Sequence, residues 1–183
     1  EKYLTGDPYI KKVVAAVVGG EKNPYWKARL LYEWEIDKLY YKLAGGHENA
    51  PNVLQRGNGS CSEYTFSFIS LCRAAGVPAR FVGSVVVRKD DASEDDVFHR
   101  WAEIYLPPYG WVPVDVNHGD KPTPRERALG FGPLTNNLLV TTIEGPVAEN
   151  PLGWGYNSAA EWTYSGTAKV YEEPIADWMP LAP

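Results

Sequence analysis

The chain has 183 residues, enough for one domain with a real core, and 44% of them are hydrophobic, which excludes a disordered chain. The net charge is −5 and no block of lysine and arginine stands out, so no nucleic-acid partner is expected. The longest apolar run, Val13 to Val18, is far shorter than a membrane span, so we expect no membrane span in this chain.

Two helices are predicted at the N-terminal end. Asp7-Pro8 and Asn23-Pro24 each join a capping residue to a proline that fits the first helical turn. The first predicted helix ends at Gly19-Gly20. The second keeps apolar residues in steps of three and four and is predicted to continue to Gly45-Gly46. Composition then predicts a loop over residues 47–58.

A third helix is predicted from Ser60 to about Ala75, because Ser60 is a typical N-cap and Glu63 completes the capping-box pattern. Cys61 is then the first helical residue, and Cys72 falls on the apolar face. Their separation along one helix is roughly 16 Å, whereas a disulfide needs Cα atoms within about 7 Å. The helix therefore excludes a bridge between these cysteines and leaves both as thiols.

Beyond the third helix the apolar period changes from helix to strand. Strands are predicted at residues 79–88, 97–106, 111–116 and 138–143, followed by a hairpin over 162–171 and an extended tail from Pro174. Helices that precede an antiparallel sheet indicate an α+β fold, and no linker divides residues 1–183, so we expect one domain.

Cys61 is the strongest candidate nucleophile. It follows the glycine-rich turn Gly57-Asn58-Gly59 at a predicted helix start, where the helix dipole favours the thiolate. The glycines allow close approach of a substrate, and the amide of Cys61 could face a developing oxyanion. A buried, inert cysteine is the alternative, and it is the interpretation we prefer for Cys72.

His99 and Asp115 are the candidate base and its orienting acid. His99 shares a strand face with Trp101, and Asp115 lies on the next predicted strand. An odd-length loop or a bulge over residues 107–110 would put both faces on the same side, with Asp115 opposite or diagonal to His99. An ordinary sheet histidine and a strand-end acid are the alternatives; the order Cys, His, Asp favours a thiolate with an oriented base.

Weaker candidates surround these three residues. Gln55 is a possible second oxyanion donor or a solvated glutamine, and Trp101 is a substrate-binding wall or a core residue. His118 is a reserve base and His47 a weaker one. The histidines and cysteines lack metal-ligand spacing and no phosphate loop is present, so no metal and no cofactor are expected.

Four motifs together resemble the core of the transglutaminase-like superfamily, in particular its bacterial and archaeal branch. They are Gly57-Asn58-Gly59-Ser60-Cys61-Ser62-Glu63-Tyr64, the stretch from Leu71 to Arg80, His99-Arg100-Trp101-Ala102-Glu103, and Gly110-Trp111-Val112-Pro113-Val114-Asp115. The resemblance covers residues 55–117, about a third of the chain. It implies a papain-like α+β fold and a triad of Cys61, His99 and Asp115.

The same resemblance implies acyl transfer at an amide through a thioester. We expect hydrolysis of a peptide or protein amide, by a cysteine peptidase or amidase, because the chain is small and shows no acceptor platform. Protein-glutamine cross-linking and a non-catalytic protein-binding module are the alternatives. Because the sequence starts at Glu1 rather than at Met, we expect a piece of a larger protein, and an extracytoplasmic location is favoured.

Overall fold

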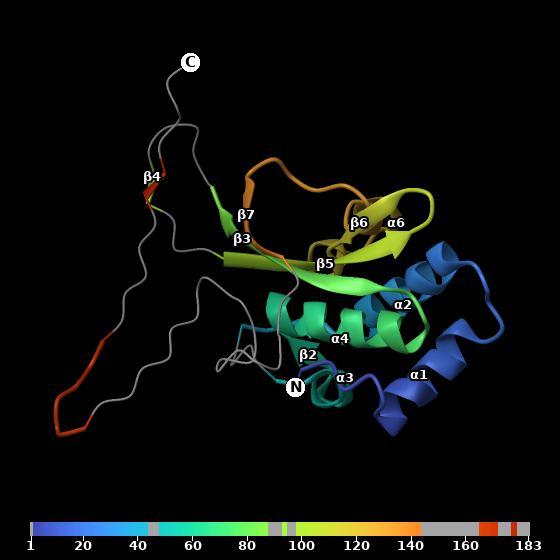
Figure 1. The fold of residues 1–183 in the computed structure, drawn as a ribbon, viewed down its shortest axis with the longest axis horizontal. Helices are drawn as coiled ribbons and strands as arrows, with labels where there is room; N and C mark the ends of the chain where they lie inside the picture. Colours follow the sequence, from blue (N-terminus) through green and yellow to red (C-terminus); the bar gives the residue numbers. More distant parts are fainter. Residues whose placement is uncertain are drawn as a thin grey trace, which may run out of the picture.

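A computed structural model describes residues 2–43, 48–87, 93–94, 98–143, 165–171 and 177–178. Its helices are α1 (Pro8–Val18), α2 (Pro24–Lys38), α3 (Ala50–Arg56), α4 (Cys61–Ala74), α5 (Val116–Gly119) and α6 (Pro124–Ala128). Its strands are β1 (Tyr40–Tyr41), β2 (Asn58–Gly59), β3 (Ala79–Val86), β4 (Ser93–Glu94), β5 (Phe98–Leu106), β6 (Gly110–Val114), β7 (Leu138–Ile143) and β8 (Asp177–Trp178). The α+β class predicted from the sequence is confirmed (Figure 1).

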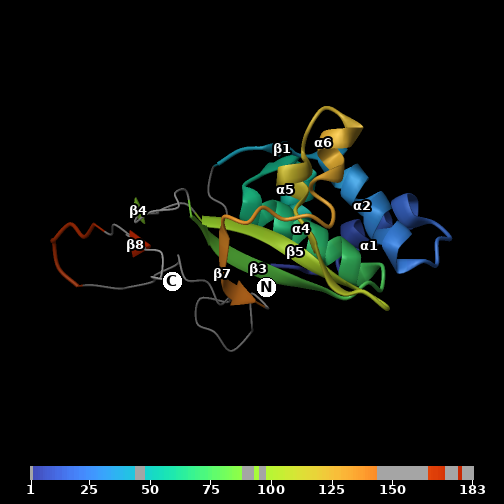
Figure 2. The same ribbon diagram turned by 90° about the horizontal axis from the view of Figure 1, so that it is seen from above.

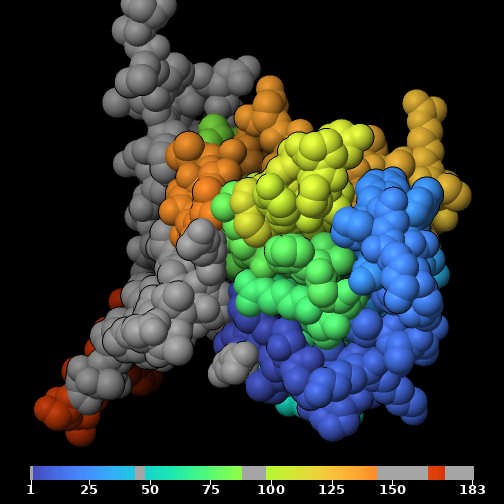
Figure 3. All heavy atoms as spheres, turned by 45° about the vertical axis from the view of Figure 1, so that its right-hand side comes forward, coloured from blue at the N-terminus to red at the C-terminus, as the bar shows by residue number. Residues whose placement is uncertain are grey.

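Helix α4 is the centre of the fold. It lies against β3 and β5 on one side, and α1, α2 and α3 pack around its other sides (Figure 1). Every residue from Cys61 to Cys72 is buried. The hydroxyls of Thr65 and Ser67 donate to helix carbonyls four residues earlier, which allows polar side chains inside this packed helix. In the space-filling view the blue N-terminal part of the chain lies directly against its green and yellow parts (Figure 3).

The main sheet has four strands in the order β6-β5-β3-β7, and all neighbouring pairs are antiparallel. Leu106 pairs with Gly110, so the turn between β5 and β6 contains three residues, an odd number. Glu103 pairs with Pro113, which puts the odd-numbered residues of both strands on one side of the sheet. The condition set for bringing Asp115 near His99 is therefore met.

Helix α2 is shorter than predicted. It ends at Lys38, and Leu39 is extended, with its amide donating to the carbonyl of Glu35. Tyr40–Tyr41 then pairs in parallel with Asn58–Gly59. The helical spacing of apolar residues continues past the end of α2, because Leu39 is buried and keeps this spacing although its backbone is extended. Backbone pairing with the segment before α4 is a tertiary effect that this pattern does not contain.

The loop predicted over residues 47–58 is wrong over most of its length, because it contains α3. Asn49 caps this helix through the amide of Asn52, and Pro51 lies in its first turn. These two residue types, taken as loop signals, act here as a cap and a first-turn proline. Gly57 ends the helix with a left-handed φ of 81°.

The later predictions have mixed outcomes. The strand at 138–143 is confirmed as β7. Residues 165–171 contain no strand, so this half of the predicted hairpin is wrong, and residues 162–164 lie outside the described residues. In the described part of the predicted tail, Asp177–Trp178 pairs with Ser93–Glu94.

Candidate active site

The connection between α3 and α4 positions Cys61. Gly59 lies so close to Glu63 that a Cβ built on it would be 2.9 Å from the Cβ of Glu63. Glu63 accepts a hydrogen bond of 3.0 Å from the amide of Ser60, and it forms an ion pair with Arg56 at a distance of 3.0 Å. This part of the predicted capping box is present, and it fixes the first turn of α4. Cys61 is the first residue of the helix and is 8% exposed.

Asp115 is held from both sides at the start of α5. One carboxylate oxygen, Oδ2, lies 2.5 Å from Nε2 of His99, and the other accepts a hydrogen bond of 2.8 Å from the amide of His118. Helix α5 itself is packed against α2, because a Cβ at Gly119 would overlap the hydroxyl of Tyr32. Both oxygens of a carboxylate that is 4% exposed are therefore fixed in direction.

His99 links the acid to the thiol. Its Nε2 faces Asp115, and its ring lies near the sulfur of Cys61, so that each of these two groups affects the pKa of the other. Trp101 stacks on the imidazole with ring centroids 6.2 Å apart and an interplanar angle of 29°. The structure thus brings together all three residues predicted as a triad.

The protonation states favour an ion pair. Burial raises the pKa of Cys61, but the hydrogen bond and charge of His99 and the guanidinium of Arg100 outweigh it and lower that pKa below its ordinary value. Burial lowers the pKa of His99, while Asp115 and Cys61 raise it to about 10. These directions favour a thiolate beside an imidazolium.

The weaker candidates fall in different places. Gln55 is an exposed residue of α3, and none of the described contacts joins it to Cys61. Trp101 is 1% exposed, so it supports the His99 ring from beneath the surface. His118 contributes its backbone amide to Asp115, and its side chain is exposed. His47 lies outside the described residues.

Sequence reasoning missed two residues beside the sulfur. The charge of Arg100 lowers the pKa of Cys61, and the charge of Cys61 raises the pKa of Tyr41 in addition to the larger effect of burial. Arg100 follows His99 directly, so its even position on β5 could have flagged it as facing α4. Tyr41 had no such signal, because its place depends on the early end of α2.

Two cavities meet at His99. One of about 560 Å³ is mainly apolar, and residues between Leu129 and Leu138 form much of its wall. The other, of about 280 Å³, is polar and is lined by Tyr41 of β1 together with Asn117 and His118 of α5. Figure 2 shows β1 beside α5. The imidazole is accessible from both sides.

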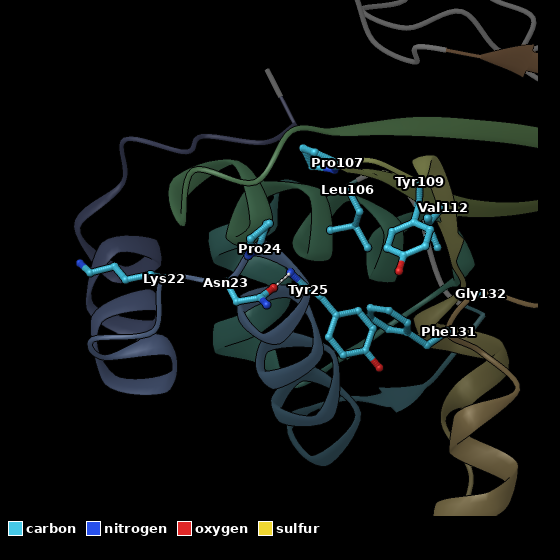
Figure 4. Close-up of a pocket in the computed structure, with 10 residues that line it drawn as sticks. All are labelled: Lys22, Asn23, Pro24, Tyr25, Leu106, Pro107, Tyr109, Val112, Phe131 and Gly132. Carbon is cyan, nitrogen blue, oxygen red and sulfur yellow. Dashed lines mark hydrogen bonds between the residues drawn. The ribbon is translucent and has the colours of Figure 1, made fainter.

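A larger cavity, of about 810 Å³, lies at the opposite end of β5. Leu106 and Tyr109 line it from the β5–β6 turn, and Tyr25 and Phe131 face it from the other side (Figure 4). None of the predicted site residues lines this cavity, so we place the candidate active site at the smaller pair.

No group of three or more His, Cys, Asp or Glu side chains in the described part of the chain is arranged to hold a metal ion. No helix within the same ranges combines the length and apolarity needed to cross a membrane.

An uncharacterized protein of Haemophilus influenzae is 28% identical over 144 residues, which cover 63% of this chain and 39% of that protein. The chain thus spans about two fifths of the length of that relative.

Solved structures share the fold. A candidate cysteine protease from Cytophaga hutchinsonii matches with a TM-score of 0.58 at 19% identity, covering 78% of this chain and 44% of that chain. A structure described as a TGase matches with a TM-score of 0.53 at 15% identity, over 71% of this chain and 37% of its own. The transglutaminase-like superfamily matches residues 11–116, which is more than half of the sequence and spans Cys61, His99 and Asp115. The chain belongs to the transglutaminase-like superfamily.

Proposed function

We propose that this chain is a cysteine hydrolase that cleaves an amide of a peptide or protein through Cys61, His99 and Asp115. The observation that carries the proposal is the single imidazole of His99, which faces Asp115 through Nε2 and lies beside the thiol of Cys61. This arrangement fits a thiolate nucleophile whose partner is held in one tautomer and one orientation.

The first half of the reaction forms a thioester. The thiolate of Cys61 attacks the amide carbonyl carbon, and the carbonyl electron pair moves to oxygen. The tetrahedral intermediate then collapses: the C–N bond breaks, and the imidazolium of His99 donates its proton to the departing amine. The backbone amide of Cys61 has no partner within its own helix, since it is the first helical residue, and it is our candidate donor to the oxyanion.

The second half releases the acid. Neutral His99 takes a proton from water, whose oxygen attacks the thioester carbon, and collapse expels the thiolate of Cys61 with both C–S bonding electrons. The imidazolium and the thiolate are then restored, and one amide and one water have become one acid and one amine. Asp115 stays ionised throughout and stabilises the imidazolium.

The cavities on both sides of His99 support an extended substrate. A peptide that crosses the imidazole would put one neighbouring side chain into the apolar cavity bounded by Leu134 and Leu138, and another into the polar cavity beside Tyr41. Amide cleavage within a chain requires such occupancy on both sides of the bond, whereas a terminal amide would need one cavity only.

Transamidation is the second candidate, because it shares the thioester and differs only in the group that resolves it. Mixtures of peptide amides, including glutamine-bearing peptides, would be incubated with a labelled primary amine, and hydrolysed and amine-labelled products would be compared by mass spectrometry. We expect hydrolysis to exceed amine incorporation; the reverse would replace our proposal with cross-linking.

Two variants test the enzymatic reading itself. Cys61→Ala should abolish turnover, whereas Cys72→Ala should keep it, since Cys72 is a fully buried thiol near the far end of the same helix. If no amide is cleaved and iodoacetamide labels Cys61 no faster than a free thiol peptide at pH 6, a non-catalytic binding module is the better description. The extracytoplasmic location stays a prediction.

A further inference from the structure

Arg100 occupies an unusual place for an arginine. It lies on β5 directly after His99, on the even-numbered face whose residues Ala102 and Ile104 are buried. Helix α4 packs on β5, and Arg100 is only 7% exposed. Cys61 is the first residue of that helix, and the charge of the Arg100 guanidinium lowers the pKa of its thiol. Two adjacent residues of one strand, His99 and Arg100, thus bring two cations to one thiolate.

The surroundings of Arg100 hold its side chain in place. The guanidinium carbon lies 5.6 Å from the ring centroid of Phe98, within the range of a cation–π contact. Tyr41 of β1 lies close to both groups: burial and then the charge of Cys61 raise the pKa of Tyr41, and the charge of Arg100 lowers it. An arginine cannot lose its proton in a protein, so the buried Arg100 keeps a permanent positive charge beside the nucleophile.

The other charged groups near the sulfur do not duplicate this role. On α4 itself, Glu63 is engaged by Arg56 of α3. His118 of α5, together with Asp120 and Lys121 just after this helix, lines the polar cavity that Tyr41 and His99 also line. Among the described groups, His99 and Arg100 are the two cations that lower the pKa of Cys61.

We propose that Arg100 is a second cation at the nucleophile, which stabilises negative charge on the sulfur of Cys61 independently of His99. The inference rests on the proposed function, because it assigns a role in the same reaction. Arg100 would act twice: it holds the resting thiolate, and it stabilises that thiolate again when the thioester collapses and the C–S electrons return to sulfur. A thiolate of lower basicity leaves faster, so the second effect speeds deacylation.

The test measures ionisation of Cys61 without requiring turnover. The rate of alkylation by iodoacetamide would be followed from pH 4 to pH 10, with peptide mapping to assign the labelled thiol, in native protein, Arg100→Met, Arg100→Lys, His99→Gln and the double variant His99→Gln/Arg100→Met. An opposite charge within hydrogen-bond reach changes such equilibria by about tenfold or more. We expect Arg100→Met to lower alkylation at pH 6 about tenfold, and Arg100→Lys to retain most of it.

The double variant separates the two cations. His99→Gln should still alkylate at a lower pH than the double variant, because Arg100 remains. If the pH profile of Arg100→Met coincides with that of native protein, or if removing Arg100 from the His99→Gln protein changes nothing, the proposal is overturned. Circular dichroism and thermal unfolding check the fold of each variant, and Arg100→Gln is the second uncharged replacement should the methionine variant be unfolded.

This outcome is distinct from failure of the proposed hydrolysis. Suppose that native protein cleaves no amide, but the pH profile of Cys61 alkylation depends on Arg100. This result would contradict the enzymatic proposal and support Arg100 as the second cation. Native protein that cleaves amides with a profile indifferent to Arg100 would do the opposite.

Discussion

The two cysteines of α4 differ in everything except their helix. Cys61, at the first position, faces His99 and Arg100, and together these lower its pKa despite burial. Cys72, near the other end, is fully buried, and burial together with the charge of Glu35 raises its pKa well above the ordinary value. On one helix, the surroundings of Cys61 favour the thiolate and those of Cys72 favour the thiol. The partners that the sheet brings to each sulfur, rather than burial alone, determine which is which.

The largest expected effect on the site around Cys61 comes from replacing His99. His99→Gln removes the proton donor and one cation from Cys61, and should reduce amide hydrolysis by about 10³-fold or more, since general acid–base catalysis alone contributes on this scale. Turnover of the best peptide amide under saturating conditions measures the loss. His118→Gln is the matched control, because His118 binds Asp115 through its backbone amide, which the substitution keeps. Equal losses in the two variants would contradict the assignment of the base.

Selective alkylation sharpens the comparison directly. At pH 6 iodoacetamide should modify Cys61 at least about 100-fold faster than Cys72, because only the thiolate reacts and Cys72 is both protonated and inaccessible. The ratio should approach one in denaturant, where both thiols lose their surroundings. Peptide mapping by mass spectrometry assigns the label. Comparable labelling of the two thiols in folded protein would show that the environments differ less than the structure indicates.

The glycine turn before Cys61 is the third feature to be tested by substitution. Gly59→Ala would bring its Cβ to 2.9 Å from the Cβ of Glu63, so the first turn of α4 must shift, and we expect unfolding free energy to fall by about 2 kcal/mol. Gly20→Ala is the control, because a Cβ there meets nothing within 4 Å. Urea unfolding measures both. If Gly59→Ala is as stable as its control, the tight approach does not constrain the nucleophile.

Sequence reasoning succeeded where a local pattern fixes a position. Ser60 and Glu63 mark the helix start at Cys61, and strand parity was correctly named as the condition for bringing Asp115 near His99. The predicted strand at 111–116 is too long, because β6 ends at Val114 and Asp115 is the N-cap of α5. These features need only neighbouring residues and the pairing of adjacent strands. The triad arrangement followed from them because each partner lies at an end of an element.

What the sequence missed depends on contacts between distant segments. Tyr41 reaches the site because α2 ends at Lys38 and the chain pairs with the residues before α4, although the apolar spacing alone predicts a longer helix. Arg100 was visible on the strand, but its contact with Cys61 depends on the packing of α4 across β5. The chemistry of a site is thus easier to predict than the side chains that tune it.

The smallest expected effect concerns Glu35, which lies near Cys72, the buried cysteine of α4. Burial raises the pKa of Glu35, and the nearby Ser67 hydroxyl offsets only part of this rise. Folded protein therefore binds a proton that unfolded protein releases as pH rises above about 4.5, so stability falls with increasing pH in this window. Glu35→Gln, which is neutral in both states, removes this loss. We expect it to gain about 1 kcal/mol over native protein at pH 8 and to differ little at pH 4. Thermal unfolding at the two pH values measures the difference, and a Glu35→Gln stability that parallels native protein across this range would mean that the Glu35 carboxyl is ionised in the core.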